Sequence, residues 1–257
     1  YSLALSFLGS GAQMIATNNT YSGGTTIGTT RIVSASGVYT PLGTLRVDEY
    51  AALGTGTVTL AGGILNSRST RAFNEVIDNV DVHRFGYGNG YDIVVAALNS
   101  FGSANTTSTL STDSTVAFQG INTLTINAPV LSTGGGSTSG FLVDGATTVA
   151  GNTVLNIGQQ LVLSGKINAT GSTLTKIGAS TLFLTHSEPA NGNAIGSWVI
   201  AAGTVESRLA NGSSNPMGAS APITLNGATW NIRHDGDNFA GTERLTTHQN
   251  NNVTIGT

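Results

Sequence analysis

The feature that most constrains the fold is a recurrence of short apolar runs separated by polar or Gly-rich breaks along the 257-residue chain. In most runs apolar residues alternate with Thr, Ser or Asn, which is the period-two pattern of a half-buried strand. No window shows the periodicity of a long amphipathic helix. The sequence therefore predicts an all-β fold, as a sandwich, barrel, propeller or solenoid. The clearest runs lie at 56–60, 93–98, 114–118, 123–131, 153–158, 160–167, 181–185, 197–205 and 223–232.

Charge and cysteine content exclude several classes of function. Only 9% of the residues are charged, the formal net charge is −3, and the basic residues are scattered. A nucleic-acid binder would need a clustered basic face, so we expect no nucleic-acid partner. The absence of cysteine removes disulfides, thiolate metal sites and cysteine nucleophiles. The apolar segment 1–16 is interrupted by Ser and Gly and is too short to span a bilayer, so we expect a buried or end-covering strand there and no membrane span.

Internal similarity favours a solenoid among the all-β folds. The segment 44–66 can be laid over 204–232 if a few turn residues are inserted in the second copy. Both segments contain a strand, a polar turn, a strand, a Gly turn and a further strand. Because each unit is too small to bury its own apolar face, it must stack on its neighbours.

Three consecutive segments carry a family resemblance: "LVLSGKINATGSTLTKIGASTLFLT" (161–185), "GSWVIAAGTVESRL" (196–209) and "PMGASAPITLNGATWNI" (216–232). Together they resemble the passenger-associated β-strand repeat of bacterial autotransporter proteins. The segments "NNTYSGGTTIG" (18–28) and "AALGTGTVTLAGGIL" (51–65) are similar to other parts of the same repeat. Ser180 stands where the repeat usually has Gly, and between residues 71 and 155 the likeness is only stylistic.

The resemblance implies a right-handed parallel β-helix, a solenoid that forms a single elongated domain over residues 1–257, with a loop insertion around 67–92. It also implies an extracellular structural or adhesive rod, secreted to the bacterial cell surface, and not an enzyme. A solenoid exposes strand edges at its ends, and such edges pair with other strands. We therefore expect either a homopolymer, assembled end to end into a fibre or sheath, or a part of a longer chain.

A polysaccharide-cleaving β-helix is the alternative, and its candidate catalytic residues are Asp78, Asp81 and His83. If Val80 and Val82 point inward, Asp81 and His83 share the outer face of a strand. Acidic groups on such a face could polarise a glycosidic bond. We prefer a solvated insertion loop, because a β-helix supplies outward polar positions everywhere.

Two further sites come from local composition. Asp235, Asp237 and Asn238 could offer oxygen ligands to a calcium ion. Three candidates on one turn are few, so an Asp-Gly turn is the preferred interpretation and no other cofactor is expected. Tyr87 and Tyr91 could make passive contacts with a glycan or a host surface.

Overall fold

The structure is a computed structural model, and it describes residues 2–8, 12–29, 32–34, 37–39, 43–68, 75–77, 80–98, 105, 108–114, 117–136, 138–185, 192–209, 215–234 and 251–256. Within these residues the regular structure consists entirely of β-strands, and no helix is present. The strands form a 16-stranded sheet, an 8-stranded sheet and a 2-stranded sheet. The prediction of an all-β fold is therefore confirmed.

The 16-stranded sheet consists of two parallel stacks that meet in one long strand, β20 (Ile167–Ile177). The beginning of β20 pairs with the first stack, its end pairs with the second, and both halves continue into β22 (Ala194–Ile200). The first stack contains β1 (Leu5–Leu8), β3 (Thr25–Gly28), β7 (Val58–Ala61), β11 (Ile93–Val95), β14 (Leu124–Ile126) and β17 (Thr147–Val149). The second stack contains β2 (Ala12–Ile15), β6 (Thr44–Val47), β8 (Ile64–Ser67), β12 (Ser108–Thr112), β15 (Val130–Gly134), β18 (Thr153–Ile157), β24 (Ile223–Leu225) and β26 (Val253–Ile255).

The 8-stranded sheet is the third stack, and it differs from the others in carrying one antiparallel strand. That strand, β9 (Glu75–Ile77), pairs only with β10. The parallel strands are β10 (Val80–Arg84), β13 (Phe118–Ile121), β16 (Phe141–Val143), β19 (Leu161–Leu163), β21 (Thr181–Leu184), β23 (Thr204–Leu209) and β25 (Thr229–His234). A separate antiparallel pair consists of β4 (Ile32–Ser34) and β5 (Gly37–Tyr39).

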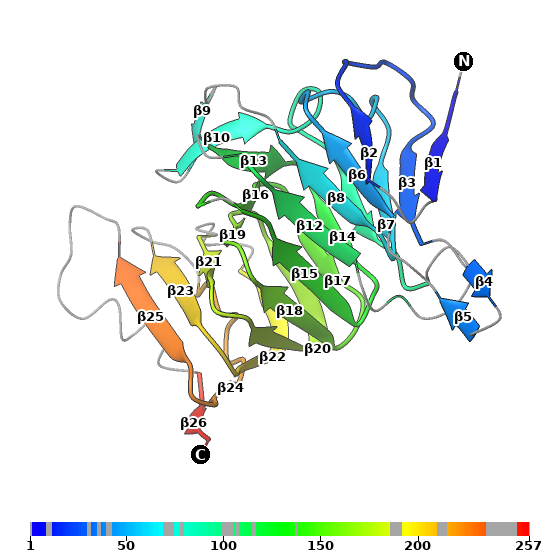
Figure 1. The fold of residues 1–257 in the computed structure, drawn as a ribbon. Helices are drawn as coiled ribbons and strands as arrows, with labels where there is room; N and C mark the ends of the chain where they lie inside the picture. Colours follow the sequence, from blue (N-terminus) through cyan, green and yellow to red (C-terminus); the bar gives the residue numbers. More distant parts are fainter. Residues whose placement is uncertain are drawn as a thin grey trace.

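The chain visits the three stacks in a fixed order through the middle of the molecule. It runs from β14 to β15 to β16, and then from β17 to β18 to β19, so that each strand pairs with its equivalent in the next round. On the successive strands β15 and β18, the hydrogen-bonded side chains of Ser132 and Asn156 are 24 residues apart. Figure 1 shows the resulting curled sheets, with β1 near one end and β26 near the other. This arrangement is consistent with a β-helix.

The core lies between the three stacks and follows from the alternating pattern of the strands. In β18, for example, Thr153, Leu155 and Ile157 are buried whereas Val154 and Asn156 are partly exposed. Parallel pairing places residues of the same orientation above one another, so that inward side chains form continuous columns. The column that begins at Phe141 continues with Leu161 and Leu182. One contiguous cluster of buried apolar side chains runs from β3 to β24.

Buried asparagine side chains satisfy backbone groups where the chain turns between stacks. Asn193 Oδ1 accepts a hydrogen bond from the Ile167 amide at 2.7 Å, and its Nδ2 donates to the Pro216 carbonyl at 2.7 Å. Asn251 Nδ2 donates to the carbonyls of Gly218 and Ala221, at 3.1 and 2.7 Å. Because an unpaired buried amide or carbonyl is costly, these bonds allow the turns to be buried.

Several predicted segments coincide with observed strands. The apolar runs at 153–158 and 181–185 contain β18 and β21, and the run at 223–232 contains β24 and the beginning of β25. The segment 1–16 forms β1 and β2, whose side chains are exposed or only partly buried, so the alternative of a buried strand is wrong. Both strands lie at the ends of their stacks, as the alternative of an end-covering segment expects. Within 67–92, β9 and β10 form a hairpin whose second strand also belongs to the third stack.

Candidate functional site

The outer face of the third stack is apolar, unlike the polar outer faces expected for half-buried strands. Leu142 and Val162 are in register on β16 and β19, between inward neighbours, and so they point away from the core. With Val82 of β10 they form a second buried cluster, separate from the core. Partly buried Phe118 and Phe183 pack against this cluster. The third stack is thus covered on both faces.

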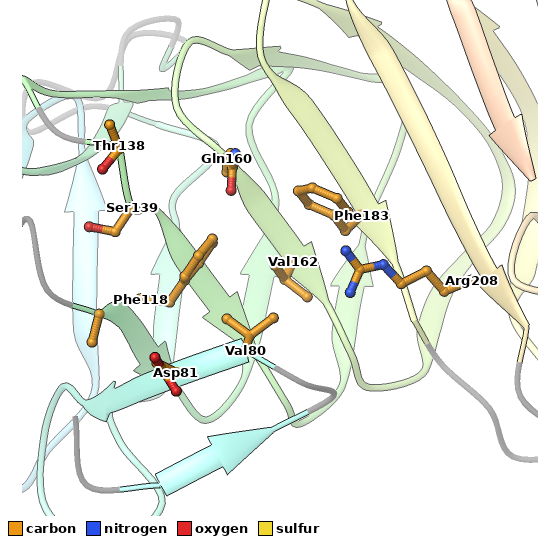
Figure 2. Close-up of a pocket in the computed structure, with 10 residues that line it drawn as sticks. Val80, Asp81, Phe118, Thr138, Ser139, Gln160, Val162, Phe183 and Arg208 are labelled. Atoms are coloured by element: carbon orange, nitrogen blue, oxygen red, sulfur yellow. The ribbon is translucent and has the colours of Figure 1, made fainter. Parts of the chain in front are cut away.

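A pocket of about 380 Å³ opens on this outer face. Its apolar side is formed by Phe118, Val162 and Phe183, and its polar lining includes Thr138 and Gln160. Asp81 and Arg208 also line it, and Figure 2 shows their charged groups at different ends of the pocket. The pocket therefore combines aromatic rings, neutral hydrogen-bonding groups and one charge of each sign.

An ion-pair network holds the β9–β10 hairpin beside the pocket. Arg84 on β10 binds the carboxylate of Glu75 on β9, and its Nη2 lies 2.6 Å from Asp144 Oδ2 after β16. Its Nη1 donates to the Asn89 carbonyl at 2.9 Å. Burial disfavours the charged guanidinium, but the hydrogen bonds and attraction from Asp144 and Glu75 outweigh this effect and raise the pKa of Arg84. The hairpin is therefore fixed to the turn that follows β16, two strands further along the stack.

Arg208 is held at the other end of the pocket by two contacts. Its guanidinium carbon lies 4.6 Å from the ring centre of Phe183, which is a cation–π geometry. Its Nε lies 2.7 Å from Glu206 Oε1, so a neighbouring carboxylate balances its charge. The remaining guanidinium nitrogens can still donate hydrogen bonds into the pocket.

The two candidate catalytic residues on β10 differ in burial. Asp81 is exposed and lines the pocket, whereas the His83 side chain is only 5% exposed and packs edge-to-face against Tyr50, with ring centres 5.8 Å apart. Val82 belongs to the outer cluster, so the condition that Val80 and Val82 point inward is not met. Alternation along the strand therefore places Asp81 and His83 on the face of β10 opposite Val82, where His83 is buried and Asp81 is exposed. Asp78 lies outside the described residues.

Tyr87 and Tyr91 line a smaller pocket of about 240 Å³ near Asp92. Tyr91 is almost fully buried, and its hydroxyl accepts a hydrogen bond from the Leu53 amide at 2.8 Å. Burial raises the pKa of Tyr91. Asp92 accepts hydrogen bonds from Asn122 and Thr123, at 2.8 and 2.7 Å. Tyr87 is partly exposed whereas Tyr91 is buried, so of the two tyrosines Tyr87 is the one that a ligand could reach.

The candidate calcium ligands Asp235, Asp237 and Asn238 lie outside the described residues, as do the contacts that they make. Among the residues that the structure describes, no group of three or more His, Cys, Asp or Glu side chains could hold a metal ion. In the same part of the chain no helix is long and apolar enough to cross a membrane.

Lys176 is a fully buried cation within the second stack. It is in register with the apolar residues Leu155 and Ile200 on the neighbouring rounds, so its stem takes the place of a core side chain. Nζ donates to the carbonyls of Gly178, Ser180 and Ala202, at 2.6, 2.6 and 2.9 Å. Burial lowers the pKa of Lys176 to about 8. The ammonium group thereby connects two successive turns.

Sequence reasoning missed the pocket on the third stack, although a signal for it exists. The runs Leu161–Leu163 and Leu182–Leu184 contain three consecutive apolar residues, where a half-buried strand would alternate. Three consecutive apolar residues indicate a strand that is covered on both faces. What covers the outer face could not be read from these runs, because the β9–β10 hairpin is distant in sequence.

The comparisons with known proteins found no relative of this chain: no family model, no curated protein and no solved structure matches it.

Proposed function

We propose that the chain folds as a right-handed parallel β-helix, forms a single elongated domain, and serves as a structural or adhesive rod secreted to a bacterial surface. The parallel stacks of β-strands and the order in which the chain visits them support the helical part of this proposal. Thr, Ser and Asn on the outer face of the second stack support exposure to water, since residues of this kind occupy solvated strand positions. The family resemblance in the sequence supports the extracellular location.

The observation that carries an assembling function is the pair of open edges at opposite ends of the second stack. Among the described strands, β2 pairs only with β6 and β26 pairs only with β24. Apolar side chains on both edge strands are exposed, Met14 by 61% and Ile255 by 72%. An unpaired edge with apolar side chains is a template for another strand. A second copy of the chain, or a further part of a longer one, could supply it.

Negative-stain electron microscopy over a concentration series tests this function. We expect rods that lengthen into filaments as the concentration rises, because end-to-end pairing is a bimolecular step. The variant Ile255→Lys places a charge on the edge and should shorten the filaments, whereas Thr148→Lys on the exposed flank of β17 should not. Particles of one short length at all concentrations would contradict assembly.

The alternative of polysaccharide cleavage receives less support from the geometry. Because His83 is buried whereas Asp81 is exposed at the pocket, the two candidates do not present a common face to a substrate. Glycosidases of the usual kind need two carboxyl groups that flank one bond.

A further inference from the structure

We propose that the pocket on the outer face of the third stack, beside the β9–β10 hairpin, binds the pyranose ring of a neutral saccharide. This function is separate from assembly at the strand edges, because the pocket lies on the flank of the stacks. Its volume of about 380 Å³ lies in the range that small-molecule sites occupy.

The apolar side of the pocket matches the hydrophobic face of a sugar ring. Phe118 and Phe183 are partly exposed there, and Val162 lies directly in register with Phe183 on the neighbouring strand. Figure 2 shows Val162 between the two aromatic side chains, and the sheet order places its strand, β19, between β13 and β21. Aromatic rings offer large apolar surfaces of fixed geometry, which suit the carbon-bound hydrogens of a pyranose.

The polar lining matches the hydroxyl groups of such a ring. Within the described part of the chain, the side chains of Asp81, Thr138 and Gln160 make no hydrogen bond to another residue, so their polar atoms are available to a ligand. The Gln160 amide and the Thr138 hydroxyl can each donate and accept, as a sugar hydroxyl does. A few convergent polar groups above an apolar surface are typical of ligand sites.

Charge selects a neutral ligand. An anionic ligand would be repelled by Asp81, and a cationic ligand would be repelled by Arg208. The ion pair with Glu206 holds the Arg208 guanidinium in place, and its remaining N–H groups can also donate hydrogen bonds in the pocket. A calcium ion needs six to eight oxygen ligands, whereas Asp81 is the single carboxylate among the lining residues.

The number of carboxylates that line the pocket also favours binding of a saccharide over its cleavage. Hydrolysis of a glycosidic bond uses a pair of carboxyl groups on either side of the bond. Among the residues that the structure describes, Asp81 is the one acid that lines the pocket, so it can accept a hydrogen bond from a sugar hydroxyl without a second described acid beside it. We therefore expect retention of the saccharide without turnover.

Saturation-transfer NMR with the purified chain tests the proposal. The probes are the methyl glycosides of glucose, galactose, mannose, fucose, xylose and N-acetylglucosamine, with glucuronic acid and glucosamine as charged comparisons. We expect signal from at least one neutral glycoside and much weaker signal from its charged counterparts. Absence of transfer from all the neutral probes at about 10 mM, or binding of the charged probes alone, would overturn the proposal.

Substitutions of the lining residues test whether the saccharide binds in this pocket. Gln160→Leu keeps the size of the side chain but removes its hydrogen bonds, and Phe183→Ala removes an aromatic face. Each should weaken binding about tenfold or more, which corresponds to the loss of one good contact. Thr148→Ala, on the exposed flank of β17, is the matched control and should bind as the wild type does. If Phe183→Ala fails to fold, Gln160→Leu still decides, and unchanged binding by a folded Gln160→Leu variant would contradict the proposed site.

Discussion

The second and third stacks contain the same kind of parallel strand but bury it differently. In β18 of the second stack, inward Leu155 alternates with outward Asn156. In β19 of the third stack, Leu161, Val162 and Leu163 are all buried. The inward columns of both stacks meet in one core, whereas only the third stack has a partner on its outer face. A column of side chains is therefore mostly apolar where the core or the hairpin covers it.

A truncation in the inward column of the third stack should lower the stability of the protein the most. Leu161→Ala removes a fully buried side chain between Phe141 and Leu182. We expect a loss of about 2 to 5 kcal/mol in the free energy of unfolding, because the core refills such a cavity only partly. Urea denaturation followed by circular dichroism measures it. The control Thr148→Ala should change stability by less than about 0.5 kcal/mol.

The outer column of the third stack gives the direct test of the comparison. Leu142→Ala should lose about 2 kcal/mol, since Leu142 is buried against Val82 and Val162 although it points away from the core. The corresponding outward change in the second stack, Ser132→Ala, should lose less than about 0.5 kcal/mol. Equal losses for Leu142→Ala and Ser132→Ala in urea denaturation would show that the outer face of the third stack is not covered.

The buried Lys176 of the second stack should make the stability of the protein depend on pH. The pKa of its ammonium group falls from 10.5 to about 8 on folding, so between these values the unfolded chain binds more protons than the folded one. Stability should therefore rise with pH across this window, by roughly 1 to 2 kcal/mol between pH 7.5 and 9.5.

The matched variant for this experiment is Lys176→Met, which keeps the apolar stem and cannot titrate. Urea denaturation of both proteins at several pH values isolates the contribution of Lys176. The stability of the Lys176→Met variant should not show the rise between about pH 7.5 and 9.5. The same slope in both proteins would mean that other groups cause it.

The smallest global effect should come from the contacts that hold the hairpin. Arg84→Gln removes the ion pairs with Glu75 and Asp144, and we expect a loss of about 1 kcal/mol, because both carboxylates are partly exposed. Hydrogen exchange should quicken in β9 and β10 but not in β18. If exchange in β9 and β10 is unchanged, the ion pairs do not hold the hairpin on the third stack.

The strands were largely predictable from sequence, and the candidate site was not. Alternation identified segments such as Thr153–Ile157 and Thr181–Leu184, because inward and outward positions on one strand differ in local composition. The same reasoning misjudged β10. A pattern such as Val-Asp-Val-His has two possible orientations, and the choice between them depended on whether Val82 faces the core or Leu142.

By itself, the sequence determined the strand class and the turns, since these depend on residues close together in the chain. Only the tertiary structure decided that Asp81 lines a pocket while His83 is buried, and that Phe118, Gln160 and Phe183 from three different rounds meet there. It also decided the partners of the buried Lys176. The physical reason is that stacking brings together side chains more than twenty residues apart, and the pattern within one strand cannot encode which neighbour each will meet.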